Sequence, residues 1–146
     1  MSDQKPHESA ALRFFHPSMD PDLISSELGL KAMRAWRAGE PRRTPDGQPL
    51  VGVQRSTYWC CTLGTIDDTS GSDEEEIGDV LRPWLIRLAA KGEFIRSISN
   101  SGGRGEVYVT LSSAPVLGNT FSVEILRTLV ELNLELSVEF FETRQV

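Results

Sequence analysis

Apolar and polar residues follow two spacings along this chain, and these spacings predict a series of strands and helices. The apolar segment 12–16, which ends before Pro17, predicts the first strand. A helix is expected next, because Asp20 and Pro21 are residue types favoured at a helix start and Gly29 is favoured just after a helix end. The apolar face of this helix consists of Leu23, Ile24 and Leu28.

Segment 31–57 follows neither spacing and predicts a long connection without regular structure. It contains the pair Asp46-Gly47 and several prolines, which are residue types that favour turns. Connections of this length are uncommon in compact domains and are often functional. We therefore expect the residues specific to this protein's function to lie in this segment.

The middle of the chain predicts a strand followed by a helix. The strand is expected at 57–63, with Trp59, Cys61 and Leu63 on one face. The helix follows because Ser72 and Glu75 match a capping box, after which apolar residues recur at helical spacing as far as residue 88. Pro83 falls inside this helix, where the loss of a hydrogen bond predicts either a kink or a helix that starts nearer Val80.

The last part of the chain predicts three strands and one helix. Strands at 94–99 and 106–111 flank a glycine-rich hairpin turn at 100–105. Ser122 is a suitable N-cap for the helix, and Asn133 is a suitable terminator. Alternating apolar residues then predict a final strand at 134–140.

Together these elements predict an α+β fold with a ferredoxin-like (split βαβ) order from Thr57 onward, preceded by an N-terminal βα unit. Polar residues on the second face of the strands indicate a mostly antiparallel sheet with helices packed on one face. Residues 1–10 are polar and predict a disordered tail. Residues 11–146 are expected to form a single α+β domain.

Charge is distributed unevenly along the chain. The net charge of −6 over 146 residues disfavours binding to nucleic acid. Six bases and two acids lie between residues 31 and 55, whereas seven acids and no base lie between residues 65 and 79. Such blocks are typical of solvated loops and helix starts, or of a charged docking surface, and both interpretations stay open.

The sequence predicts a cytoplasmic protein with no membrane partner. No apolar run approaches the roughly 20 residues that cross a bilayer. The first ten residues lack the apolar stretch of a secretory signal.

Residues suited to catalysis or metal binding are few. The histidines are His7 and His16, which predict neither a nucleophilic triad nor a zinc site. The acids at 73–76 fit helix capping better than acid–base catalysis, and the glycines at 102–105 join two predicted strands, unlike a phosphate-binding loop. The adjacent Cys60 and Cys61 are expected to be reduced, ordinary core or interface residues. We predict no catalytic residue, no cofactor and no metal.

Aromatic and basic residues gather in the long connection. Trp and Arg are enriched at interface hot spots, and they also occur together on platforms for single-stranded nucleic acid. Alternatively, Trp36 anchors the connection on the core while the arginines stay solvated. The candidate interaction surface consists of Arg34, Trp36, Arg37, Arg42, Arg43, Glu74, Glu75 and Glu76.

Several short motifs resemble a bacterial family of domains of unknown function, DUF4279. They are Phe14-Phe15, Asp20-Pro21, Ile24-Ser25, Leu28-Gly29-Leu30 and Ala35-Trp36-Arg37-Ala38-Gly39. The Trp84-Leu85 helix and the helix–strand segment 125–140 are also similar, so the resemblance extends from about Leu12 to Phe141. It implies an α+β domain found in bacteria, and it brings no established activity or catalytic residues.

Two functions from different classes follow from these features. The first is a non-enzymatic protein-interaction module of the immunity or adapter kind, because the chain is small and acidic and has segregated charge. The alternative is a small-ligand-binding protein or enzyme, with a cleft near Trp36, Arg37 and Trp59 between the long connection and the sheet. A homodimer through a sheet edge or the polar sheet face is compatible with either function.

Overall fold

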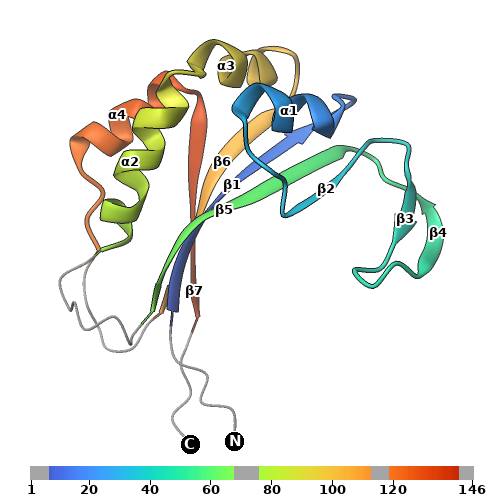
Figure 1. The fold of residues 1–146 in the computed structure, drawn as a ribbon, viewed down its shortest axis with the longest axis horizontal. Helices are drawn as coiled ribbons and strands as arrows, with labels where there is room; N and C mark the ends of the chain where they lie inside the picture. The colour runs from blue at the N-terminus through green and yellow to red at the C-terminus, as the bar shows by residue number, and fades with distance from the viewer. Residues whose placement is uncertain (1–6, 68–75, 113–118, 142–146) are drawn as a thin grey trace, which may run out of the picture.

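The computed structural model describes residues 7–67, 76–112 and 119–141, which have a mixed α+β architecture (Figure 1). The described residues form four helices and seven strands. Along the chain these are β1 (His7–His16), α1 (Pro21–Leu28), β2 (Arg34–Trp36), β3 (Pro41–Arg43), β4 (Pro49–Val53), β5 (Thr57–Asp67), α2 (Ile77–Ala89), α3 (Gly92–Asn100), β6 (Arg104–Ser112), α4 (Val123–Glu131) and β7 (Leu134–Phe141).

Five strands form the main sheet in the order β2-β5-β1-β6-β7, and β3 pairs with β4 in a separate two-stranded sheet. The pairs in the main sheet are antiparallel except for β6 and β7, which are parallel. The mostly antiparallel sheet and the leading β1–α1 unit confirm those two predictions. The β3–β4 hairpin stands apart from the helical layer, beyond the β2 edge of the sheet (Figure 1).

The hydrophobic core lies between one face of the main sheet and the helices, as predicted. Strand residues in the core include Leu12 and Phe14 of β1 and Trp59 of β5. Each helix adds apolar side chains to the same cluster, among them Ile24 of α1, Leu81 of α2, Ile98 of α3 and Leu129 of α4. The opposite face of the sheet carries no helix in the described residues (Figure 1).

The predicted boundaries of α1 are confirmed in detail. The Asp20 carboxylate accepts a hydrogen bond from the Asp22 amide at 2.9 Å, and Pro21 occupies the first position of the helix. Gly29 has a φ of 65°, in the left-handed region that glycine adopts without steric cost. The amide of Leu30 then donates to the Ser25 carbonyl at 3.1 Å and closes the helix end.

The predicted strand at 94–99 is wrong, because these residues belong to helix α3. The apolar and β-branched side chains favoured a strand, but the buried positions are Gly92, Ile95 and Ile98, which recur every three residues on one helical face. The glycine-rich segment therefore joins a helix to β6 and is not a hairpin turn. The order after β5 is α2-α3-β6-α4-β7, so the predicted β-α-β-β-α-β order is not present.

The expectation of an irregular connection at 31–57 is also wrong, because this segment contains β2, β3 and β4. The turn of the hairpin is Thr44-Pro45-Asp46-Gly47, in which the Gly47 amide donates to the Thr44 carbonyl at 2.9 Å. Pro41 and Pro49 stand at the first positions of their strands, where a missing amide donor is tolerated.

Four further predictions concern the first ten residues, the start of α2, Pro83 and the extent of the domain. β1 begins at His7, so the prediction of a disordered tail is wrong for residues 7–10, and residues 1–6 lie outside the described part. The proposed capping box at Ser72 and Glu75 also lies outside it; α2 is preceded by Glu76, whose amide donates to the Asp79 carboxylate at 3.0 Å. α2 starts at Ile77 and continues as one helix through Pro83, so the alternative of a start nearer Val80 is wrong. The single domain over 11–146 stays a prediction.

Candidate functional site

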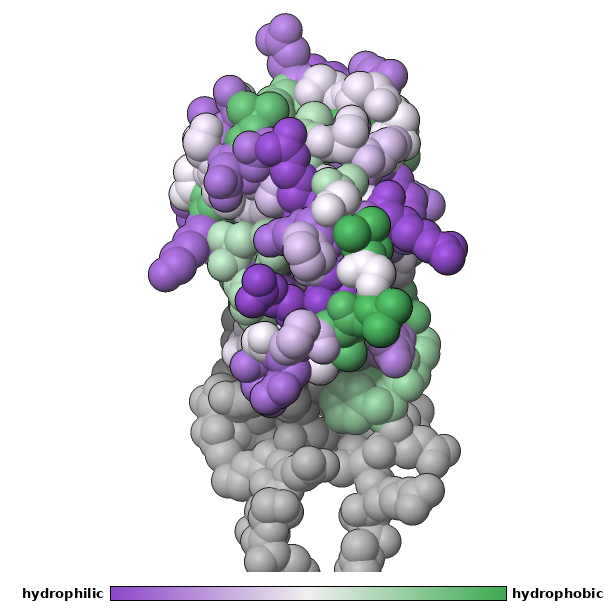
Figure 2. Space-filling model, turned by 90° about the vertical axis from the view of Figure 1, so that its right-hand side faces the viewer, coloured by the Kyte–Doolittle hydropathy of each residue, from purple (hydrophilic) through white to green (hydrophobic). Residues whose placement is uncertain are grey.

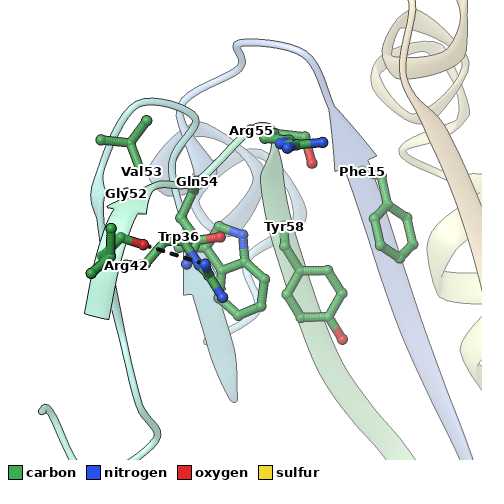
Figure 3. A pocket seen from close by; sticks show the side chains of 10 residues that line it. Phe15, Trp36, Arg42, Gly52, Val53, Gln54, Arg55 and Tyr58 are labelled. Atoms are coloured by element: carbon green, nitrogen blue, oxygen red, sulfur yellow. Dashed lines mark hydrogen bonds between the residues drawn. The ribbon is translucent and has the colours of Figure 1, made fainter. Parts of the chain in front are cut away.

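A cleft of about 690 Å³ lies between the β3–β4 hairpin and the open face of the main sheet (Figure 3). One wall comes from the hairpin and the segment after it, and the floor comes from β1, β2 and β5. The lining residues are Phe15, Trp36, Arg42, Val51, Gly52, Val53, Gln54, Arg55, Ser56 and Tyr58. Binding sites for small molecules and short segments commonly have volumes of about 300–1,000 Å³.

Three aromatic rings form the floor of the cleft. Trp36 and Phe15 both pair with Tyr58 in the strand register, so the side chains lie in a row across β2, β5 and β1. The ring centroids are 4.7 Å apart for Trp36 and Tyr58 and 5.2 Å apart for Tyr58 and Phe15. Burial, and then the neighbouring Cys60, raise the pKa of Tyr58 to about 12, although Arg13 acts in the opposite direction. The Tyr58 hydroxyl is therefore neutral at physiological pH.

Arginines make the cleft positive. Arg42 and Arg55 line it, and the described lining residues include no acid. Arg42 Nη1 donates to the Val51 carbonyl at 3.3 Å, which fixes the guanidinium beside the hairpin wall (Figure 3). Arg34 extends the positive charge along the β2 edge, where its Cζ lies 5.1 Å from the Trp36 ring centroid. A net negative protein thus has a local concentration of positive charge at this cleft.

Two valines on the hairpin wall of the cleft are exposed. Val51 is 92% exposed and Val53 is 54% exposed. Figure 2, which faces the hairpin side of the molecule, shows apolar side chains in green among strongly polar ones in purple. Exposed aliphatic side chains clustered beside arginines and aromatic rings are typical of a binding surface rather than of a solvated loop.

Beyond Phe15 on the open face, the buried carboxylate of Glu106 accepts several hydrogen bonds. Its Oε1 accepts from Arg13 Nε at 2.7 Å, and its Oε2 accepts from Ser137 Oγ at 2.6 Å and Arg104 Nη1 at 3.3 Å. Burial alone would raise the pKa of Glu106, but the hydrogen bonds from Ser137 and Arg13 and the charges of Arg13 and Arg104 hold it below its ordinary value. Because Glu106 pairs with these two arginines, the positive charge available to a ligand lies at the hairpin end.

The turn from β1 into α1 is fixed by His16, which lies on the helix-covered side of β1 with Leu12 and Phe14. His16 Nδ1 accepts from the amides of Ser18 at 3.0 Å and Met19 at 2.9 Å, while Nε2 lies 2.9 Å from Ser101 Oγ. Burial lowers the pKa of His16, which matches a neutral ring that accepts at Nδ1. His16 thus has a structural part in this turn.

The structure separates the residues of the predicted interaction surface. Trp36 and Arg42 line the cleft, Arg34 lies at its edge, and Arg43 is exposed on the hairpin outside the lining. Arg37 is directed to α1, where its Nη1 is 3.5 Å from Asp20 Oδ2. Glu76 accepts from the Thr120 amide at 3.1 Å beside α2, and Glu74 and Glu75 lie outside the described residues.

Trp59 was expected in the cleft, and that expectation is wrong. It is fully buried in the core on the other face of β5, where its Nε1 donates to Ser25 Oγ at 2.9 Å. Tyr58 and Phe15 are the floor residues that sequence reasoning missed. Strand alternation contained the signal, because a core Trp59 requires Tyr58 to point to the opposite face.

The described residues outside the cleft offer little other chemistry. No group of three or more histidine, cysteine or acidic side chains lies close enough to hold a metal within the described part of the chain. Cys60 and Cys61 are free, and burial raises the pKa of the Cys61 thiol, which disfavours the reactive thiolate. Among these residues no helix has the length and apolar character needed to span a membrane.

The fold and the cleft define a mixed α+β protein with a projecting hairpin and one sheet face that no helix of the described residues covers. A family model matches residues 5–140, and the chain belongs to that family, which is described as a domain of unknown function, DUF4279. This confirms the resemblance seen in the sequence motifs. Searches of the curated proteins and of the solved structures found no match.

Proposed function

We propose that this protein is a non-catalytic interaction module whose hairpin cleft binds an acidic segment of a partner protein. The observation that carries the proposal is the composition of the cleft: aromatic rings on the floor, exposed valines on the wall and two arginines, with no acid among the described lining residues. Such a site attracts a segment that has carboxylates beside apolar side chains.

Aromatic and arginine side chains give this cleft the properties of an interface hot spot. Trp, Tyr and Arg contribute more binding free energy than other residue types when they are desolvated. Trp36, Tyr58 and Arg42 lie together here (Figure 3), and Val51 of the hairpin also lines the cleft. An apolar side chain of the partner would contact the rings, and its carboxylates would pair with Arg42 and Arg55.

Charge strengthens the argument for an acidic partner. The protein as a whole has a net charge of −6 and is not generally attractive to anions. The excess of arginine at the cleft is therefore a local feature. Complementary charge raises the association rate and selects among partners. The interaction is therefore expected to weaken with salt, because exposed charges are screened beyond about 10 Å at 0.1 M ionic strength.

Fluorescence anisotropy with a defined peptide tests this function. The probe is a fluorescein-labelled peptide of alternating Glu and Phe, and the comparison probe replaces every Glu with Gln. We expect wild-type protein to bind the acidic probe more tightly. The Arg42→Glu substitution should weaken binding roughly tenfold, as for a hot-spot residue.

A matched control is available on the same strand. Arg43 is as exposed as Arg42 but does not line the cleft, so Arg43→Glu should leave the affinity for the acidic probe unchanged. Equal effects of the two substitutions would show a non-specific charge effect and would contradict the cleft as the site. Failure of the acidic probe to bind, together with binding of a small aromatic acid such as indole-3-acetate, would identify a small-ligand site instead.

A further inference from the structure

We infer that the acidic segment that fits the cleft is present in this chain itself and binds in a second copy. This inference rests on the proposed function and names its partner. Residues 65–79 contain seven acids and no base, whereas 31–55, which includes the hairpin, contains six bases and two acids. The two segments have opposite charge and both adjoin β5.

Within one chain the acidic segment is too far from the cleft to occupy it. β5 starts beside the cleft at Thr57 and ends at Asp67, so its 11 residues separate the two by roughly 33 Å at about 3.3 Å per residue. The chain returns at that same distant end, because Val80 of α2 packs against Gly64 of β5. The acidic segment therefore begins and resumes away from the hairpin.

Chain length makes the separation decisive. Residues 68–75 connect Asp67 to Glu76, and a fully extended chain covers at most about 3.6 Å per residue. A segment that must leave and return over eight residues reaches about 14 Å from its ends, which is less than half of the distance to the cleft. Only the acidic segment of another molecule can reach this cleft.

A two-fold dimer satisfies both sites at once. If two copies lie side by side with their β5 strands in opposite directions, the acidic segment of each copy faces the cleft of the other. Such a closed, isologous arrangement uses each surface once and limits assembly to two copies. An acidic segment of another protein would compete for the same cleft, so self-association and partner binding would exclude each other.

Multi-angle light scattering of the full chain, measured after size exclusion over a range of concentrations, tests the inference. At low salt we expect a mass twice the 16.2 kDa of one chain. At about 1 M salt, where the screening length falls to about 3 Å, we expect the mass of one chain. Arg42→Glu should weaken dimerisation roughly tenfold, as should the double substitution Glu74→Lys with Glu75→Lys, while Arg43→Glu should have no effect.

A charge-exchange variant distinguishes loss of the proposed contact from damage to the fold. The triple variant that combines Arg42→Glu with Glu74→Lys and Glu75→Lys restores opposite charges at position 42 and at positions 74 and 75, and it should dimerise more strongly than either parent variant. A monomer at all concentrations that still binds the acidic probe peptide would overturn the self-association and leave the proposed function standing. A dimer whose affinity neither set of substitutions changes would also overturn the inference, because that dimer would use another surface.

Discussion

The two faces of the main sheet differ in what holds their side chains, although they share the same strands. Trp59 and Tyr58 are neighbours on β5, yet Trp59 is completely buried beneath the helices while Tyr58 forms the floor of the open cleft. The covered face is an apolar core. The open face combines ring contacts with a charged network around Glu106. Stability therefore depends mainly on the covered face, and the proposed binding site lies on the open face.

The largest loss of stability is expected on the covered face. Trp59→Ala removes the largest fully buried side chain and its hydrogen bond to Ser25. Substitutions of this kind cost about 3–5 kcal/mol, since they remove apolar contacts and leave a cavity. Urea unfolding followed by circular dichroism measures the change. A loss below about 1 kcal/mol would contradict the assignment of stability mainly to the covered face, because large-to-small changes in a packed core cost more than that.

An intermediate loss is expected at the charged network on the open face. Glu106→Gln leaves Arg13 without its anion, and we expect a cost of about 2 kcal/mol at pH 7, below the range for fully buried pairs because Arg13 is partly exposed. The folded pKa of Glu106 lies below its ordinary value of 4.5, so its stabilisation is present above that pH and is lost as the pH falls through the folded pKa.

The pH dependence distinguishes charge from packing at this position. Unfolding measured from pH 7 down to pH 3 should show less acid destabilisation in Glu106→Gln than in wild type, because the variant has no carboxylate to protonate. Parallel stability curves for the two proteins would show that Glu106 contributes by shape and hydrogen bonding alone.

The smallest change in stability is expected on the hairpin. Val51 is 92% exposed, so Val51→Ser should alter the free energy of unfolding by no more than about 0.5 kcal/mol. The same substitution should weaken binding of the acidic probe peptide, because Val51 lines the cleft. Leu50→Ser is the matched control, as Leu50 is the adjacent residue and lies outside the lining. An equal loss of affinity in both variants would show that Val51 has no specific part in the proposed binding site.

The covered face could be predicted from the sequence because its signals are local. The Asp20-Pro21 start and Gly29 end of α1, and the alternation in β5 and β7, depend on residues close together in the chain. The error at α3 came from residues that suit both structures, since Ile95 and Ile98 favour a strand by type and a helix by spacing. Tertiary packing decides between the two.

The cleft could be predicted only in part. Trp36 and Arg42 were recognised by composition, but Phe15 joins them through the pairing of β1 with β5, which the sequence does not specify. The hairpin turn could have been predicted, because Pro45-Asp46-Gly47 is a known turn sequence between short strands. The abundance of proline around it concealed the strands.

The central place of β1 has a consequence for how the chain folds. This strand precedes the other described strands in the chain, but its neighbours are β5 and β6, and the contact between Arg13 and Glu106 joins residues 93 positions apart. Pairings between such distant segments slow folding, because a long loop must close before any contact stabilises it. On the ribosome, the apolar face of β1 therefore stays uncovered until most of the chain has been made. Newly made chains pass through a period in which chaperones and aggregation compete for that strand.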